Sequence, residues 1–154
     1  MMKRFFIPLI LTLPILLNSC GDTQLEKDLK FIEEYIVSHS LDTNDVKVDE
    51  YGVHYIELKE GVGRNVEETD SVVFVYSLRL INDVEASFVT WDDPFCSKVS
   101  TLVGGLRLGM TNMKAEGKAV ILMPSSLGYG PYWYSTIPSN SVLIFYVDLI
   151  KVVS

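Results

Sequence analysis

The chain has 154 residues, 48% of them hydrophobic, which suffices for one well-formed core and is too short for two large domains. Its formal net charge is −7, with 20 acidic and 13 basic side chains. This acidity argues against nucleic acid as a partner, because phosphate binding requires clustered lysine and arginine.

The N-terminus has the pattern of a targeting segment. Lys3 and Arg4 precede an almost continuously apolar run over residues 5–17. The run is shorter than the roughly 20 residues that a membrane-spanning helix needs. We therefore interpret it as the apolar part of a signal peptide.

The sequence L-N-S-C-G at residues 17–21 follows the apolar run directly. It resembles the lipobox of bacterial lipoprotein signals, which places the modified cysteine at the mature N-terminus. The resemblance implies a signal peptide over residues 1–19 and a lipid on Cys20, so that the mature domain lies outside the cytoplasm and is tethered to a membrane. The alternatives are an uncleaved anchor and an ordinary secretory peptide with a chance cysteine.

The other cysteine is Cys96. If lipid occupies Cys20, no intramolecular disulfide is possible. The nearest basic residue in sequence is Lys98, and no histidine is close. We expect Cys96 to be an inert, partly buried side chain and not a reactive thiol.

Residues 23–38 have the pattern of an amphipathic helix. Thr23 and Glu26 have the spacing of a capping box at its start. The apolar positions recur at helical spacing: Leu25, Leu29, Ile32 and Ile36. We expect this helix to lie in a tether over residues 20–50 and to pack its apolar stripe on the core of the chain or on a partner.

Four segments have the composition of strands, namely residues 52–58, 70–81, 117–123 and 141–152. In the second, Tyr76 falls on the same face as Phe74 and Leu78, and that face is apolar. The last segment is apolar on both faces, which predicts a central strand.

The segments between these strands differ in character. Residues 82–100 predict an ordered loop that carries aromatic side chains. Residues 101–113 predict a short helix held by tertiary packing, since each glycine in it lowers helicity by about 1 kcal/mol relative to alanine. Residues 124–140 form a loop punctuated by glycine and proline, with Tyr129 and an aromatic trio at 132–134.

This order predicts an α+β domain over residues 51–154, in which an antiparallel sheet is wrapped on one short helix, with the extra amphipathic helix at its N-terminal side. A lone histidine such as His54 is a poor metal ligand, so we expect no metal site.

Several motifs carry a resemblance to the FKBP-type peptidyl-prolyl isomerases, over roughly two thirds of the chain. They are G-V-G-R at 61–64, V-F-V-Y-S at 73–77, G-G-L-R-L-G-M-T-N-M at 104–113, G-K-A-V-I-L-M-P-S-S-L-G-Y-G at 117–130 and I-P-S-N-S-V-L-I-F-Y-V-D-L-I-K-V at 137–152. The last two are the most specific. With the lipobox and the N-terminal helix, the chain is similar to membrane-tethered FKBP lipoproteins of bacterial envelopes.

The resemblance implies the residues that perform catalysis. The pocket tyrosine at the end of the family's first long strand matches Tyr76, and the tyrosine of its A-Y-G motif matches Tyr129. The phenylalanine of the last strand matches Phe145. The V-I dipeptide, whose second N–H holds the substrate carbonyl, matches Leu102 and Val103.

Other positions are implied to bind the substrate. Ile137 matches the isoleucine before the flap proline, and Leu106 replaces the family's floor tryptophan. The family's F-D pair has no clean counterpart, because Phe88 is followed by a valine. Asp92 is either the substitute for that acid or an ordinary loop aspartate, and Phe95 is a candidate for the other pocket aromatic.

The function implied is cis–trans isomerisation of X–Pro bonds, assisting the folding of exported proteins. Its partners are proline-containing polypeptide segments and, through the lipid, a bacterial envelope membrane, with the domain facing the periplasm or the surface. No cofactor is needed, because a pocket that favours the twisted amide lowers the barrier without acid, base or metal. The alternatives are a non-catalytic peptide-binding or chaperone module on the same fold, and a structural lipoprotein whose aromatics 132–134 pack on its own surface.

Overall fold

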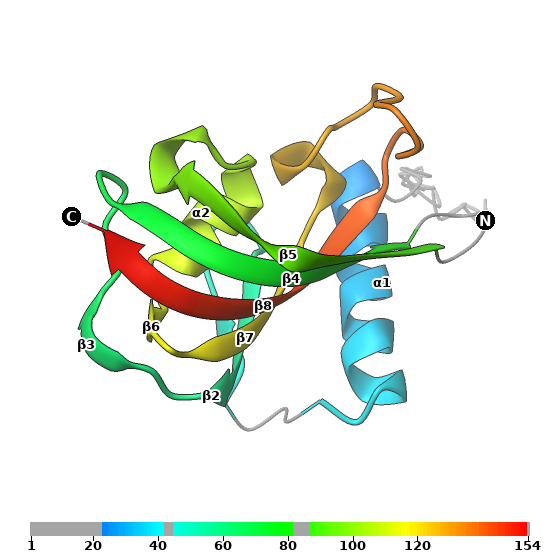
Figure 1. Ribbon diagram of the computed structural model, residues 1–154. Coiled ribbons are helices and arrows are strands. Elements are labelled where there is room, and N and C mark those ends of the chain that lie inside the picture. Colours follow the sequence, from blue (N-terminus) through cyan, green and yellow to red (C-terminus); the bar gives the residue numbers. More distant parts are fainter. Residues whose placement is uncertain (1–22, 42–44, 82–86, 154) are drawn as a thin grey trace, which may run out of the picture.

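The computed structural model describes residues 23–41, 45–81 and 87–153, with residues 87–92 described by their backbone alone. In chain order the elements are α1 (Gln24–Ser38), β1 (Lys47–Val48), β2 (His54–Lys59), β3 (Val62–Asn65), β4 (Ser71–Ile81), β5 (Ser87–Lys98), η1 (Val99–Thr101), α2 (Gly104–Met110), β6 (Lys114–Ala115), β7 (Lys118–Met123), η2 (Ser125–Leu127) and β8 (Val142–Val153). The described strands form one antiparallel sheet in the order β1-β2-β7-β8-β4-β5 and a small sheet of β3 and β6 (Figure 1).

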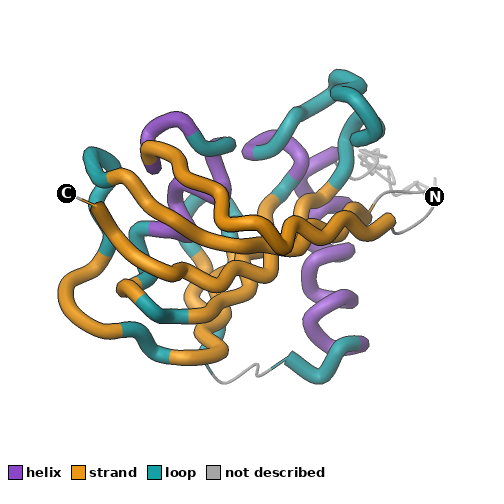
Figure 2. The backbone as a smooth tube through the Cα atoms, in the orientation of Figure 1, coloured by secondary structure: helices purple, strands orange, loops and turns teal. Residues whose placement is uncertain are grey.

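The central position of β8, between β7 and β4, follows from its two apolar faces. Leu143 and Phe145 belong to the core on the α2 side of the sheet, whereas Val142 and Ile144 belong to a second cluster on the α1 side. Successive strand residues point to opposite faces, so the part of a strand that lies between two helical layers is apolar on both faces, as residues 142–145 are. The predicted α+β fold with a central last strand is confirmed, and the two helices lie against opposite faces of the sheet (Figures 1 and 2).

Helix α1 begins at the predicted capping box. The Thr23 hydroxyl accepts a hydrogen bond from the Glu26 N–H at 3.3 Å, and the Glu26 carboxylate accepts one from the Thr23 N–H at 2.6 Å. Ile32 and Ile36 are buried against the sheet, whereas Leu25 is 45% exposed. The helix therefore packs within the chain as part of the domain body, with the first predicted stripe position left at the surface.

Asp28 joins α1 to the loop that follows β7. It is 1% exposed, and its Oδ2 accepts hydrogen bonds from the Ser125 N–H at 2.8 Å and the Ser125 hydroxyl at 2.6 Å. Its Oδ1 accepts a third from the Gln24 amide at 2.6 Å. Asp28 is not one of the apolar stripe positions of the helix, and it is buried because its carboxylate satisfies buried donors.

The predicted loop over 82–100 is wrong for most of its length, since residues Ser87–Lys98 form strand β5 along β4. β5 is the edge of the main sheet, where the acidic residues and Pro94 are tolerated because one side of the strand has no ladder to maintain. Cys96 lies opposite Val73 and is exposed, which corrects the expectation of a partly buried side chain.

The glycines of α2 allow the helix to lie directly on β7. A Cβ at Gly105 would come within 2.5 Å of the Met123 Cβ, and one at Gly109 would come within 2.5 Å of the Ile121 Cγ2. Leu106 and Met110 are buried beside them. Close packing on the strand thus offsets the low helix propensity of glycine, and it confines the helix to Gly104–Met110 within the predicted 101–113.

An ion pair between the buried Asp70 carboxylate and the half-exposed Arg64 guanidinium holds the turn before α2 in place. Asp70 is 4% exposed and accepts two hydrogen bonds from the Arg64 guanidinium, at 2.7 and 2.8 Å, and one from the Glu67 N–H at 2.8 Å. The Asp70 carbonyl in turn accepts from the Val99 N–H at 3.0 Å. The hydrogen bonds from Arg64 and Glu67 lower the pKa of the Asp70 carboxyl to about 2.

Replacing Asp28 with alanine removes the acceptor of both Ser125 donors, which stay buried. We expect Asp28→Ala to lower the free energy of unfolding by about 3 kcal/mol in urea denaturation, and Asp28→Asn, which keeps one acceptor oxygen, to lower it less. Glu33→Ala, on the exposed side of the same helix, is the matched control and should change stability by no more than about 0.5 kcal/mol. Equal stability of Asp28→Ala and the control would contradict this role.

The Asp70 pair predicts a dependence of stability on pH. The folded pKa of about 2 lies below the unfolded value, so the stabilisation is fully present above the unfolded pKa of about 3.9 and is lost as the pH falls through 2. Asp70→Asn should therefore show a shallower decline in unfolding free energy between about pH 5 and pH 2 than the wild type. An unchanged slope would mean that other carboxylates account for the decline.

Candidate functional site

A cavity of about 190 Å³ opens between the sheet and the start of α2. It is lined by Phe74, Tyr76, Phe95, Ser97, Thr101, Leu102, Val103, Leu106, Tyr129 and Phe145. These come from strands β4, β5 and β8, from the segment η1 to α2, and from the loop after η2. The lining has no charged side chain and is mainly aromatic and aliphatic, as expected of a pocket that takes an uncharged, apolar group.

The aromatic walls contact one another. The ring of Tyr76 lies 5.5 Å from that of Phe145 and 5.7 Å from that of Phe74, measured between centroids. Phe95 meets Phe74 edge-on at 5.6 Å and 87°. Rings in tilted and edge-to-face contact stabilise each other, so these walls are preorganised.

The floor and the edge of the cavity come from the α2 region. Leu106 is 4% exposed and packs with fully buried Phe74 in the main core. Val103 is the N-cap of α2, with φ −57° and ψ 147°, and its carbonyl accepts from the Arg107 N–H at 2.9 Å. Within the described part of the chain, the Val103 N–H has no backbone acceptor, which leaves a donor beside the cavity.

Tyr129 closes the side of the cavity next to the long loop. Its ring stacks on that of Tyr134 at 4.4 Å and 8°. Burial raises the pKa of the Tyr129 phenol, and the neighbouring Tyr134 and Tyr76 add to the shift. The phenol is therefore neutral at physiological pH and can act only as an uncharged hydrogen-bonding group.

The structure brings together most of the residues named from the sequence. Tyr76, Val103, Tyr129, Phe145, Phe95, Leu102 and Leu106 all line the cavity. Ile137 does not line it, since this residue is 9% exposed, packs in the main core and pairs with Tyr134 through two backbone hydrogen bonds. Phe88 and Asp92 have their backbone in β5, but their side chains lie outside what the structure describes, as does Cys20.

Three lining residues were missed. Phe74 could have been found, because it is two positions from Tyr76 and on the same strand face. Ser97 and Thr101 could not, since their position depends on β5 turning into η1, where their hydroxyls are 3.0 Å apart. The Thr101 hydroxyl also donates to the Lys98 carbonyl at 2.8 Å, which keeps the mouth of the cavity ordered.

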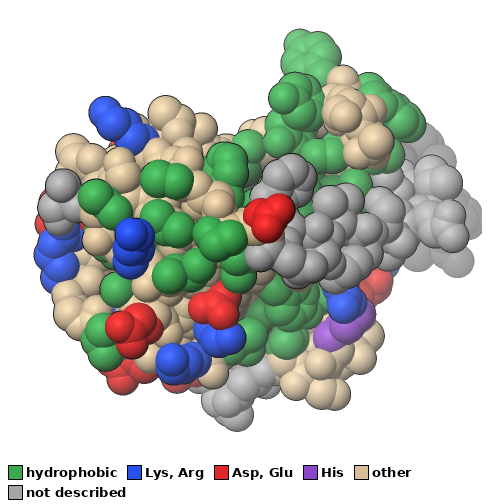
Figure 3. Space-filling model, viewed as in Figure 1, with side chains coloured by type: hydrophobic (Ala, Val, Ile, Leu, Met, Phe, Trp, Pro, Cys, Tyr) green, Lys and Arg blue, Asp and Glu red, His purple; other side chains and the backbone are tan. Residues whose placement is uncertain are grey.

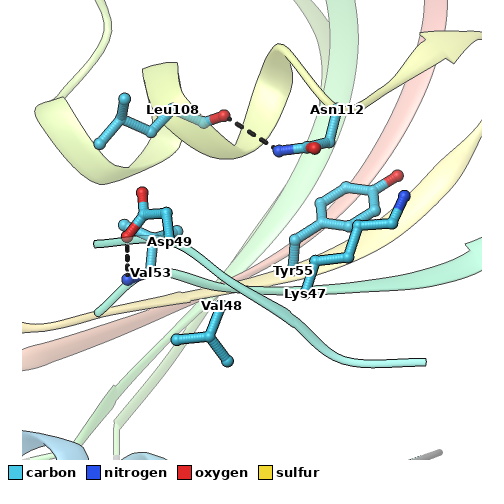
Figure 4. Close-up of a pocket in the computed structure, with 7 residues that line it drawn as sticks. All are labelled: Lys47, Val48, Asp49, Val53, Tyr55, Leu108 and Asn112. Carbon is cyan, nitrogen blue, oxygen red and sulfur yellow. Dashed lines mark hydrogen bonds between the residues drawn. The ribbon is translucent and has the colours of Figure 1, made fainter. Parts of the chain in front are cut away.

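A second cavity, of about 140 Å³, lies between the β1–β2 hairpin and the end of α2 (Figure 4). The Lys47 ammonium is 5.4 Å from the centroid of the Tyr55 ring. Asp49 accepts hydrogen bonds from the Tyr51 and Val53 N–H groups, so its carboxylate stabilises the turn in which it lies. None of the candidate site residues named from the sequence lines this cavity.

Two properties of the described residues concern metal binding and membrane insertion. No group of three or more His, Cys, Asp or Glu side chains there could hold a metal ion. No helix there has the length and hydropathy required to cross a bilayer.

The chain is similar in sequence to proteins of a known family. The profile of the FKBP-type peptidyl-prolyl cis-trans isomerase family matches residues 63–150. The chain is 32% identical over 108 residues to the FKBP-type peptidyl-prolyl cis-trans isomerase FkpA of Escherichia coli K12, covering 70% of this chain and 40% of the relative. It is 28% identical over 127 residues to the peptidyl-prolyl cis-trans isomerase Mip of Chlamydia pneumoniae, covering 82% and 48%.

Solved structures agree in fold. The crystal structure of FkpA from Escherichia coli superposes with a TM-score of 0.69 at 26% identity, over 84% of this chain and 61% of that one. A peptidyl-prolyl cis-trans isomerase of Pseudomonas syringae superposes with a TM-score of 0.68 at 22% identity, over 87% and 99%. The chain spans about 40% of the length of the Escherichia coli relative that it matches in sequence.

The family profile covers more than half of the chain, and it includes the strands and the helix that build the aromatic cavity. The chain therefore belongs to the FKBP-type peptidyl-prolyl cis-trans isomerase family.

Proposed function

We propose that the chain catalyses cis–trans isomerisation of X–Pro bonds in exported proteins, by binding the proline in the cavity between β4, β8 and α2. The observation that carries the proposal is the uncharged aromatic cavity with a backbone donor, the Val103 N–H, beside it. A proline ring is compact and apolar and brings no charge into such a site.

The chemistry requires no titrating group. Rotation about an X–Pro bond must cross a barrier of about 18–20 kcal/mol that amide resonance imposes, while the cis and trans forms differ by about 1 kcal/mol. The twisted amide at the top of the barrier is less dipolar than the planar one, so a dry pocket favours it. Binding that is stronger in the transition state than in the ground state is what accelerates the reaction.

The cavity residues divide this work. Tyr76 and Phe145 hold the proline ring between tilted aromatic faces, and Tyr129 closes the side toward the long loop. The Val103 N–H donates to the carbonyl of the substrate and fixes it while the bond turns. Leu102, Phe95 and the buried Leu106 supply apolar contact around the ring.

We also propose a membrane-tethered location. Residues 1–19 act as a signal peptide, Cys20 carries the lipid, residues 20–50 are the tether and residues 51–154 are the isomerase domain. The lipobox pattern at residues 17–21 supports this reading. Since α1 is packed on the sheet and Cys20 lies only three residues before Thr23, a lipid on Cys20 would hold the domain close to the bilayer.

A second candidate function is peptide binding without catalysis. The observation that favours it is Leu106 at the cavity floor, where an aliphatic side chain gives a less polarisable surface than the tryptophan of the family. Such a surface would still bind the proline ring, but it would stabilise the twisted amide less strongly relative to the planar one.

The first test is catalysis of cis–trans exchange in a proline tetrapeptide. The wild-type chain should exceed the uncatalysed rate, and Tyr76→Ala, which removes one face of the cavity, should lower kcat/KM about tenfold or more, equivalent to ~1.4 kcal/mol. Tyr132→Ala is the control, because Tyr132 is exposed and does not line the cavity. A wild-type rate equal to the uncatalysed one, with peptide binding retained, would favour the second candidate.

The Val103 donor can be removed without moving the backbone. Proline requires φ near −65° and an extended preceding residue, and Val103 has φ −57° while Leu102 has φ −71° and ψ 157°. Val103→Pro should therefore fold and lower kcat/KM about tenfold relative to Val103→Ala, which shortens the side chain but keeps the N–H. Equal activity of the two variants would show that the substrate carbonyl is held elsewhere.

A further inference from the structure

The loop after η2 carries exposed aromatic side chains that the cavity does not use. Tyr132 is 75% exposed and Trp133 is 68% exposed, and neither lines the cavity. We call residues 130–135 the aromatic tip. Figure 3 shows hydrophobic side chains gathered on the projection at the upper right, which is this loop.

Hydrogen bonds and one ring stack fix the base of the aromatic tip, while Tyr132 and Trp133 stay exposed. The Asn140 N–H donates to the Gly130 carbonyl at 2.8 Å and closes the base of the loop. Tyr134 and Ile137 exchange two backbone hydrogen bonds, at 3.0 and 2.8 Å, and Tyr134 stacks on Tyr129. The two outermost aromatics are thus displayed at little cost in conformational entropy.

The segment that carries the aromatic tip is uncharged. The sequence has no charged side chain from Ala119 to Val147, although the chain as a whole has a net charge of −7. The indole N–H of Trp133 already donates to the Ser135 carbonyl at 2.7 Å. A loop without charged side chains can approach zwitterionic headgroups without electrostatic repulsion of its own, and the indole N–H of Trp133 already has an acceptor.

The N-terminal end of α1 lies at the same end of the molecule. Asp28, in the second turn of α1, is bonded to Ser125 at the start of the segment from which the loop rises. A Cβ at Gly52 would touch both Leu29 and Pro124, which shows how closely the two segments pack. Figure 1 shows the blue end of α1 beside this segment, so α1 begins near the loop that carries the aromatic tip, and Cys20 precedes Thr23 by three residues in the sequence.

We propose that the aromatic tip docks on the phospholipid surface to which the N-terminal segment holds the chain, with Tyr132 and Trp133 at the headgroup level. Tyrosine and tryptophan are the side chains that favour this boundary. Tyr129 lines the cavity and stacks on Tyr134 of the aromatic tip, so the cavity then lies close to the bilayer. This inference rests on the membrane location proposed above.

The test uses the full chain reconstituted with phosphatidylcholine vesicles and compares its tryptophan emission with that of Trp133→Ser. Trp91 is the other tryptophan and is present in both proteins, so the difference spectrum reports on Trp133. We expect this difference emission to move to shorter wavelength on vesicles, to be reduced by lipids brominated near the headgroup, and to lose its quenching by acrylamide. A Trp133 that stays fully accessible to acrylamide on vesicles overturns the proposal.

Two controls separate the possible causes. Flotation of the vesicles tests the membrane location itself. If the chain floats with the vesicles while Trp133 remains in water, the docking of the aromatic tip is refuted and the membrane location stands. Val62→Ser changes an apolar side chain that is 58% exposed on β3, away from the loop in Figure 1, and should leave the Trp133 signal unchanged. A blue shift that appears with an unstructured proline-rich peptide and not with vesicles would assign the tip to polypeptide binding and overturn the proposal.

Discussion

The burial of β8 on both faces is the constraint on which the rest of the structure depends. One face packs with α2 and supplies Phe145 to the cavity, and the other packs with α1 through Ile144 and its neighbours. Because the strand also pairs with β4 and β7, it aligns Phe145 opposite Leu78 and Ile121. One strand therefore positions both a wall of the cavity and the surface on which α1 packs.

The position of α2 follows from that sheet. Gly105 and Gly109 bring the helix onto β7, and its N-cap, Val103, is carried to the edge of the cavity. The ion pair of Asp70 with Arg64 holds the preceding turn through the bond from the Val99 N–H to the Asp70 carbonyl. A donor that must meet a substrate carbonyl within hydrogen-bond distance needs such support, since small displacements weaken the bond steeply.

Much of this arrangement could be predicted from the sequence, and the failures have physical causes. The apolar faces of β4 and β8 give strong two-residue periodicity, which places Tyr76 and the central strand correctly. β5 was missed because Pro94 and its acidic neighbours are tolerated only at a sheet edge, which local pattern does not reveal. Asp28 was missed because its partner, Ser125, lies 97 residues away, so nothing in the pattern of α1 indicates a buried carboxylate.

The central claim is that the cavity catalyses the isomerisation of X–Pro bonds and does not only bind the peptides that contain them. Exchange NMR spectroscopy tests this directly, with a proline peptide in excess over the protein. The account predicts cis–trans exchange cross-peaks that require the protein, together with a shift of the Val103 amide resonance on peptide addition. Resonance shifts at the residues that line the cavity without any exchange cross-peak would contradict catalysis and leave a binding module.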